Sequence, residues 1–151
     1  MTSEKINYIE LPASNLEGTK RFFSDAFGWQ FVDYGPDYVA IQNAGLDGGF
    51  YRSPLVAEVG KGSALVVLYS SDLEASLNKV EQAGGKIVKS IFSFPGGRRF
   101  HFSDPSGNEY AVWSERKLPS STSQRAKDSQ VHIDRIRTML KATDNDSSVS
   151  Q

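Results

Sequence analysis

Apolar residues in this chain form short alternating runs and stripes at helical spacing, and the same order of elements occurs twice. In the first half, strands are predicted at residues 6–11, 29–34 and 38–42, with a helix between the first and the second of them. A turn-rich loop at residues 43–49 then leads into Phe50 and Tyr51. In the second half, strands are predicted at residues 64–69, 86–94, 99–103 and 109–114, with a helix between the first and the second of them. Each half is therefore predicted to be a β-α-β-β-β unit.

The two halves are related by a constant spacing. Ser14 in the first half corresponds to Ser71 in the second, and Gly28 corresponds to Gly85, so the offset is 57 residues at both ends of the matched segment. The offset holds without a gap through a helix cap, a helix and a turn. This regularity indicates a duplicated supersecondary unit, and such duplication places a ligand cup where the two units meet.

The composition narrows the possible classes of function. The 151 residues are enough for one domain with a sizeable core, and the net charge is −1 without a long basic run. Neither nucleic acid nor an anionic membrane is therefore an expected partner. The absence of cysteine excludes disulfides, thiolate metal ligands and thiol nucleophiles. The N-terminus has no signal-peptide pattern and the longest apolar stretch is too short for a membrane span, so we expect a soluble, cytoplasmic protein.

A change of composition near residue 116 predicts the domain organisation. Residues 1–116 are expected to form one domain, with half-units at about residues 5–55 and 62–116. Residues 117–151 are expected to form a tail with a Pro/Ser/Thr/Gln linker, a short amphipathic helix within residues 129–142 and a disordered end. An isolated helix of this length is marginal in water, so the helix needs a packing partner if it forms.

Two motifs carry a resemblance to a known family. The first is Ile9-Glu10-Leu11-Pro12 followed by Asn15-Leu16-Glu17 and by Phe27-Gly28-Trp29. The second is the segment Phe-Ser-Asp-Pro-Ser-Gly-Asn-Glu-Tyr at residues 102–110. With these motifs, residues 5 to about 115 resemble the vicinal oxygen chelate superfamily, which includes glyoxalases, bleomycin-resistance proteins and extradiol dioxygenases.

The resemblance implies an α+β fold. Two βαβββ units would form an open, cup-shaped, barrel-like sheet of eight strands with flanking helices, and the protein would be a homodimer with the cup near or across the interface. The resemblance says less about the chemistry than about the fold, because this fold hosts isomerases, lyases, dioxygenases and pure binding proteins.

Metal-using members of this family take two histidines and two carboxylates from the first and last strands of each unit. The matching positions here are Tyr8, Leu65, Ala111 and one residue within 49–51, and none of them is a histidine or a carboxylate. A four-ligand site of imidazoles and carboxylates cannot form at these positions. The expectation is therefore a protein without a metal or another cofactor.

Strand alternation predicts which side chains line the cup. The expected lining is aromatic and aliphatic with a few polar groups, which is the mixture that a small-molecule pocket uses. Apolar walls would supply binding energy, and isolated polar groups would fix the orientation of the ligand. The side chains expected to contact the ligand are Tyr8, Gln42, Phe50, Tyr69, Arg99, Glu109 and Trp113.

Two further cup residues are candidates for catalysis. Glu10, an inward carboxylate made more basic by desolvation, would act as a general base, or it would form a structural ion pair with Arg99. His101 is the one histidine of the domain and would transfer protons, or it would be a half-buried strand histidine bonded to a neighbour. His132 lies in the tail and is expected to be solvated.

Three classes of function follow from these patterns. The leading hypothesis is a glyoxalase/bleomycin-resistance-like protein that binds a small, partly hydrophobic molecule without a metal. The alternative is a lyase, isomerase or dioxygenase of the same superfamily that uses acid–base chemistry at Glu10 and His101, or a relocated metal site. In the third class, the tail helix binds a partner and the cup has no role.

Overall fold

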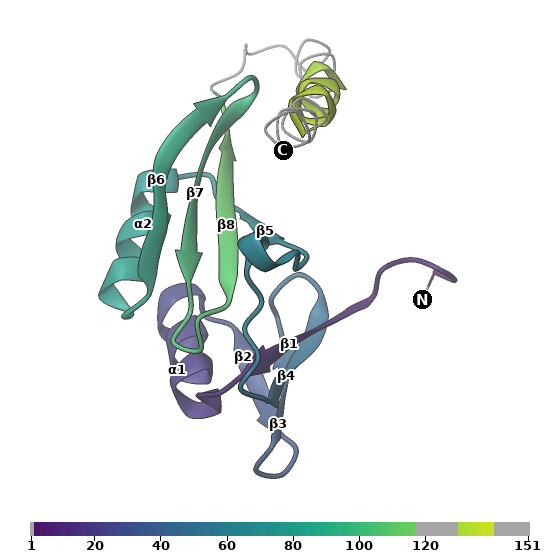
Figure 1. Ribbon diagram of the computed structural model, residues 1–151, viewed down its shortest axis with the longest axis vertical. Coiled ribbons are helices and arrows are strands. Elements are labelled where there is room, and N and C mark those ends of the chain that lie inside the picture. The colour runs from purple at the N-terminus through teal and green to yellow at the C-terminus, as the bar shows by residue number, and fades with distance from the viewer. Residues whose placement is uncertain (1, 117–129, 141–151) are drawn as a thin grey trace.

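The computed structural model describes residues 2–116 and 130–140 and has the α+β architecture expected from the sequence (Figure 1). Two successive βαβββ units follow one another, joined by a segment that contains the short 3-10 helix η1. The elements in chain order are β1 (Tyr8–Ala13), α1 (Leu16–Phe27), β2 (Gln30–Asp33), β3 (Tyr38–Gln42), β4 (Asp47–Arg52), η1 (Val59–Lys61), β5 (Val66–Tyr69), α2 (Leu73–Gln82), β6 (Lys86–Phe94), β7 (Gly97–Ser103) and β8 (Glu109–Glu115).

Each unit forms its own four-stranded sheet. The strand order is β1-β4-β3-β2 in the first sheet and β5-β8-β7-β6 in the second, and the first strand of each unit pairs in parallel with the last. The units are thus related by the same topology, as the 57-residue offset predicted. The two sheets are hydrogen-bonded separately and are not closed into a barrel, in agreement with the open arrangement of two half-units expected from the sequence.

Local sequence signals determine where the two long helices begin and end. The Asn15 side chain accepts a hydrogen bond from the Gly18 amide at 3.0 Å, and the Asp72 side chain accepts one from the Ala75 amide at 3.1 Å. Helix α1 ends at Gly28, whose φ of 71° lies in the left-handed region that favours glycine. Caps that were visible in the sequence therefore set the lengths of these helices.

Strand β4 begins earlier than the sequence pattern predicted. Residues 43–49 were expected to be a loop, but β4 starts at Asp47 and includes Gly48 and Gly49. These glycines allow close packing within the sheet. A Cβ at Gly48 would lie 2.3 Å from the Ile9 carbonyl oxygen, and a Cβ at Gly49 would lie 2.0 Å from the Tyr38 hydroxyl. Here glycine marks a crowded strand and not a turn.

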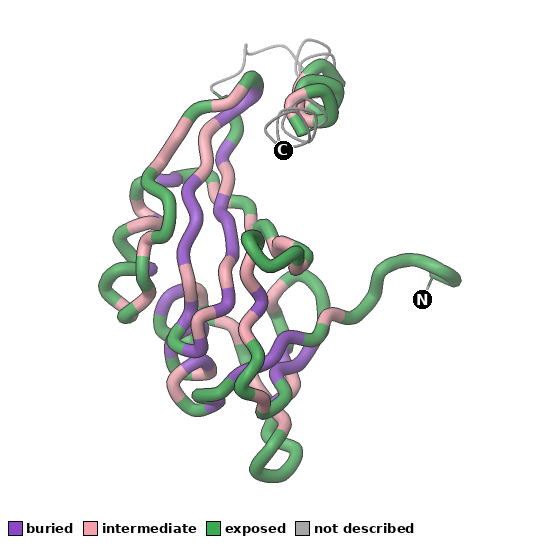
Figure 2. The backbone as a smooth tube through the Cα atoms, viewed as in Figure 1, coloured by how far each residue is buried: buried purple, intermediate pink, exposed green. Residues whose placement is uncertain are grey.

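An aromatic core holds the two units together. Phe23 of α1 is fully buried and contacts rings from both units, including Phe50 of the first unit and Phe102 and Tyr110 of the second. Figure 2 shows the buried backbone concentrated in the strands of the two sheets and in the facing side of α1. Because these ring contacts cross from one unit to the other, they fix the relative position of the two sheets.

The turn between β7 and β8 adds a polar connection between the units. Asn108 is fully buried; its Nδ2 donates to the Pro12 carbonyl at 2.6 Å, and its Oδ1 accepts from the Ala57 amide at 2.9 Å. The buried Asp104 carboxylate accepts from the Tyr110 hydroxyl at 2.6 Å and from the Ser106 amide at 2.8 Å. Burial is the main influence on Asp104 and raises the pKa of its carboxyl, while these hydrogen bonds act in the opposite direction.

A separate helix occupies residues 130–140, inside the stretch where the sequence predicted one, and it lies near the end of the β6–β7 hairpin (Figure 1). The predicted linker and the predicted disordered end lie outside the described residues. In the described part of the chain, no helix is long and apolar enough to cross a membrane.

Candidate functional site

Each sheet has one face against the helices and one face turned away from them, which we call its open face. The alternation predicted from the sequence is observed on both sheets. Leu11, Ile41 and Val112 are buried in the core, whereas Tyr8 and Tyr69 are 46% and 57% exposed on the open faces. Tyr8 and Tyr69, two of the cup positions inferred from strand periodicity, therefore lie on the open faces.

On the open face of the first sheet, three side chains form a hydrogen-bonded chain. The Tyr38 hydroxyl donates to Glu10 Oε2 at 3.0 Å, and the Tyr8 and Tyr38 hydroxyl oxygens are 2.5 Å apart. Because the Tyr38 hydroxyl donates its proton to Glu10, it accepts a hydrogen bond from the Tyr8 hydroxyl. Burial, with these hydrogen bonds, raises the pKa of Tyr38 well above its usual value, so Tyr38 keeps its proton. A shallow cavity of about 380 Å³, lined by residues that include Tyr8, Tyr38 and Gln42, lies beside this chain.

Gly49 makes this hydrogen-bonded chain possible. It pairs with Glu10 on one side and with Ala40 on the other, so it lies in the strand between β1 and β3. The Tyr38 hydroxyl occupies the space that a Cβ at Gly49 would need. Tyr38 therefore crosses over Gly49 to reach Glu10 on the far strand.

On the open face of the second sheet, His101 and Glu109 form a buried pair. His101 is 1% exposed, and its Nδ1 lies 2.8 Å from Glu109 Oε2. Burial lowers the pKa of His101, and so do the charges of Arg99 and Lys89, although the hydrogen bond to Glu109 works in the opposite direction. His101 is therefore neutral near pH 7 and donates its Nδ1 proton to the carboxylate, which leaves Nε2 as a hydrogen-bond acceptor.

Arg99 lies beside this pair and lacks a carboxylate partner within the described residues. Its guanidinium carbon is 5.3 Å from the centre of the Phe92 ring, and that ring is 6.0 Å from the His101 ring. Burial lowers the pKa of Arg99. Both Arg99 Nε and His101 Nε2 are buried without a hydrogen-bond partner in the described structure, so two unpaired polar nitrogens lie near one aromatic ring.

The lowered pKa of His101 predicts that acid weakens the fold. Below about pH 6.5 the unfolded chain binds a proton at this histidine that the folded chain does not bind, so the free energy of unfolding falls as the pH drops and levels off below the folded pKa. Urea unfolding of the full chain between about pH 5 and pH 7.5 measures this slope. The His101→Asn variant is expected to have a smaller slope than the parent. An equal slope in both proteins would contradict the assignment.

The candidate residues thus fall into two groups that the structure does not bring together. Glu10 contacts Tyr38 on the first sheet, and His101 contacts Glu109 on the second. The alternative ion pair between Glu10 and Arg99 is not formed. Glu10 is also exposed, so the desolvation expected of a general base at this position is absent.

Phe50 is a corrected assignment. It was expected to contact the ligand, but it pairs with Leu11 in the parallel β1–β4 ladder, so its side chain points to the helices. It is fully buried, and its ring is stacked 5.8 Å from Phe23. Phe50 therefore belongs to the core.

The aromatic residues at the outer end of the second sheet are also arranged differently from the expectation. Trp113 makes an edge contact with Tyr69 at 5.3 Å, and its ring is stacked on His132 of the C-terminal helix, with 4.8 Å between the ring centres. His132 was expected to be solvated, but it is packed against the domain. No signal in the sequence linked this tail histidine to Trp113, because the two lie on different elements without a shared repeat.

Comparison with known proteins agrees with this topology. A model of the Glyoxalase/Bleomycin resistance protein/Dioxygenase superfamily matches residues 5–112, which is more than half of the chain. The chain belongs to this superfamily. A glyoxylase-like domain-containing protein of Didymella fabae is 29% identical over 119 residues, which cover 72% of this chain and 91% of the relative.

Solved structures of the glyoxalase/bleomycin-resistance type have the same fold. A glyoxalase-related enzyme from Fulvimarina pelagi matches with a TM-score of 0.63 and 19% identity, covering 79% of this chain and 94% of the other. TnmS3, an antibiotic-binding protein from Streptomyces sp. CB03234, matches with a TM-score of 0.56 and 19% identity, covering 77% of this chain and 99% of the other. At these identities the similarity establishes the fold alone.

The residues at the metal positions of the glyoxalase superfamily do not fit a metal in this chain. Tyr8 and Leu65 stand at the histidine positions, and Ala111 stands at one carboxylate position. Gly49 lies in β4, which pairs with β1, and Ala111 lies in β8, which pairs with β5. Small residues therefore stand at matching places in the two sheets. In the described parts of the chain, no three His, Asp or Glu side chains gather as a metal site requires. We therefore derive no step through a metal.

Proposed function

We propose that this protein binds a small, partly apolar molecule on its open faces through its own side chains. The observation that carries the proposal is the cluster of Phe92, Arg99 and His101 on the second sheet, where two buried nitrogens lack partners beside an aromatic ring. Buried polar groups without partners are rare, and a bound molecule would satisfy them. The antibiotic-binding relative is consistent with a binding role.

The chemistry of this cluster defines what the ligand must offer. His101 Nε2, as an acceptor, requires a hydroxyl or N–H donor on the ligand. Arg99, as a donor, requires a carbonyl, phenolate or carboxylate oxygen. Phe92 supplies apolar contact area. The ligand would therefore have adjacent donor and acceptor groups on an apolar or aromatic body.

In this proposal, the homodimer remains an expectation from the family resemblance, and the cytoplasmic location remains an expectation from the sequence pattern. A second copy of the chain would cover the apolar side chains that the open faces expose, such as Tyr8, Val67 and Tyr69.

Proton transfer is the second candidate function, and the His101–Glu109 pair favours it. A neutral imidazole held by a carboxylate at Nδ1, with Nε2 free, is the arrangement of a general base and its orienting partner. Such a base would remove a proton next to a carbonyl group whose oxygen is held by Arg99. Of the two candidate bases, Glu10 and His101, this function uses His101 as the group that would accept the proton.

A thermal-shift screen of small hydroxylated aromatic and carbonyl compounds tests the proposal. We expect that a stabilising compound binds the His101→Asn and Arg99→Gln variants at least about tenfold more weakly, because each variant removes a partner from a desolvated group. Arg21→Gln, an exposed arginine on α1, is the matched control and is expected to bind like the parent.

The outcomes separate the two candidate functions. Binding without consumption of the compound supports the binding role, whereas turnover that the His101→Asn variant loses would assign proton transfer. Equal affinity in the parent and both cluster variants would contradict the proposed site. Titration of divalent metals in the same assay is expected to leave the melting temperature unchanged, and a clear stabilisation at micromolar metal would overturn a metal-free function.

A further inference from the structure

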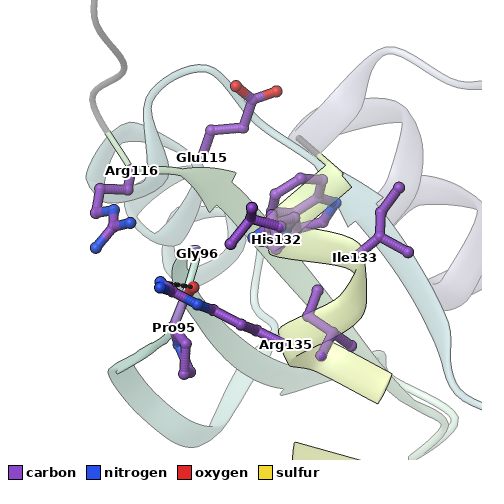
Figure 3. A pocket seen from close by; sticks show the side chains of 10 residues that line it. Pro95, Gly96, Glu115, Arg116, His132, Ile133 and Arg135 are labelled. Atoms are coloured by element: carbon purple, nitrogen blue, oxygen red, sulfur yellow. Dashed lines mark hydrogen bonds between the residues drawn. The ribbon is translucent and has the colours of Figure 1, made fainter. Parts of the chain in front are cut away.

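A second cavity lies away from the paired residues of the open faces, between the β6–β7 loop, the end of β8 and the C-terminal helix (Figure 3). Its volume is about 560 Å³, which is within the range of small-molecule sites. We propose that this cavity binds a small organic anion with an apolar body, such as an aromatic carboxylic acid. The proposal is independent of the function proposed for the open faces.

The walls of the cavity are mainly apolar and come from both the domain and the helix. Pro95 and Trp113 form the wall on the domain side, and Val131, Ile133 and Ile136 form the wall on the helix side. Val131 and Ile133 are 43% and 44% exposed, so part of this apolar surface faces open space. An apolar ligand body would cover it, and the free energy of binding would come mainly from that burial.

Two arginines give the cavity its preference for an anion. Arg116 follows β8, and Arg135 lies on the helix; both line the cavity. Arg135 donates to the Pro95 carbonyl at 3.5 Å, a long hydrogen bond that leaves its other donors without a carboxylate partner among the described residues. Glu115 is the acidic residue of the lining, and in Figure 3 its carboxylate points away from Arg135 and His132. A ligand carboxylate would therefore meet two cations and no facing carboxylate.

His132 adds a polar contact that the protein itself does not satisfy. Its ring is stacked on Trp113 and lies 5.5 Å from the Phe94 ring, and both of its ring nitrogens are buried without a partner in the described structure. Leaving a buried polar nitrogen unpaired costs free energy. A carboxyl group in the cavity would provide a hydrogen-bond partner for a ring that the helix already holds in place.

Gly96 allows the helix to form this wall. A Cβ at Gly96 would lie 1.4 Å from His132 Nδ1, so any larger residue displaces the histidine. The φ of Gly96 is not in the left-handed region, so alanine fits the backbone of the loop. The neighbouring Gly97 differs, because a Cβ there would lie 2.3 Å from the Ser114 carbonyl oxygen of the adjacent strand. Gly96→Ala therefore displaces the His132 ring from this wall without straining the sheet.

Isothermal titration calorimetry of the full chain with hydrocinnamate, and with hydrocinnamyl alcohol as its neutral counterpart, tests the proposal. We expect the anion to bind about tenfold more tightly than the alcohol, because the arginines act on the charge alone. Arg116→Gln and Arg135→Gln are each expected to weaken hydrocinnamate binding by about three- to fivefold. Gly96→Ala is expected to weaken it by at least about tenfold, because it displaces the His132 ring that lines the cavity.

Arg21→Gln serves as the matched control and is expected to bind hydrocinnamate like the parent, since Arg21 lies on the exposed side of α1. Circular dichroism establishes that each variant is folded. Equal binding of the acid and the alcohol would overturn the proposal, and so would unchanged binding in both arginine variants. None of these variants touches His101 or Glu109, so failure here leaves the function proposed for the open faces untouched.

Discussion

Replacing Phe23 by alanine is expected to lower the free energy of unfolding by about 4 kcal/mol. Phe23 is 0% exposed, so its ring leaves a cavity when it is removed. It contacts Trp29 in a stacked arrangement with 4.3 Å between ring centres, and it meets Phe102 and Tyr110 of the second unit. Because Phe23 joins the two units, the loss is expected to appear as one cooperative transition at lower urea concentration.

Tyr34→Ala is the control for this change. Tyr34 is 64% exposed, so its removal is expected to change the free energy of unfolding by less than about 0.5 kcal/mol. A loss below about 1 kcal/mol for Phe23→Ala, or two separate transitions in the parent protein, would contradict a core shared by the two units.

Replacing Asn108 by alanine is expected to cost about 3 kcal/mol, the second largest effect. The side chain is fully buried and joins three segments: the Pro12 carbonyl of the first unit, the Ala57 amide between the units and the Asp104 carboxylate of its own turn. Alanine would remove the side-chain partner of the Pro12 carbonyl and of the Ala57 amide, and it would take one of several donors from Asp104. Urea unfolding of the variant measures the loss.

Asn78→Ala provides the comparison for the asparagine substitution. Asn78 is exposed on α2, where alanine is a better helix former, so the variant is expected to be as stable as the parent or slightly more stable. If Asn108→Ala is as stable as Asn78→Ala, the polar connection between the units does not contribute to the fold.

Strand periodicity was the most successful part of the sequence analysis. Residues two apart on a strand share a face whatever the neighbouring strands do, so the open-face positions of Tyr8, Tyr69 and Trp113 followed from local sequence alone. Helix ends were similarly predictable, because a cap such as Asn15 acts within three residues of the chain.

The contacts between strands were harder to predict because they depend on register. Phe50 was placed on the wrong face, since its partner Leu11 is 39 residues away and no local signal sets that pairing. The His101–Glu109 pair had a signal that went unused: both residues flank one tight turn and point to the same face of a hairpin. The Tyr38–Glu10 contact had no signal in the sequence, because it connects β3 to β1 across the intervening strand β4.

The C-terminal helix illustrates a further limit of periodicity. The sequence predicted a helix there and the need for a packing partner, but not the side that would be used. Contacts to the domain are made by His132 and Arg135, whereas Val131 and Ile133 remain 43% and 44% exposed. The apolar stripe of the helix did not identify the contact residue, because a histidine ring can stack on a tryptophan ring in place of an apolar side chain.

The crossing of Tyr38 over Gly49 adds a cost to any mutational path that would place a carboxylate ligand at residue 49. A carboxylate at position 49 requires a Cβ in space that the Tyr38 hydroxyl already fills, so that substitution must displace the tyrosine side chain. Shortening residue 38 opens the space, but it also removes the donor that holds Glu10. Filling this one ligand position therefore costs an existing contact of Tyr38, whichever of the two substitutions comes first.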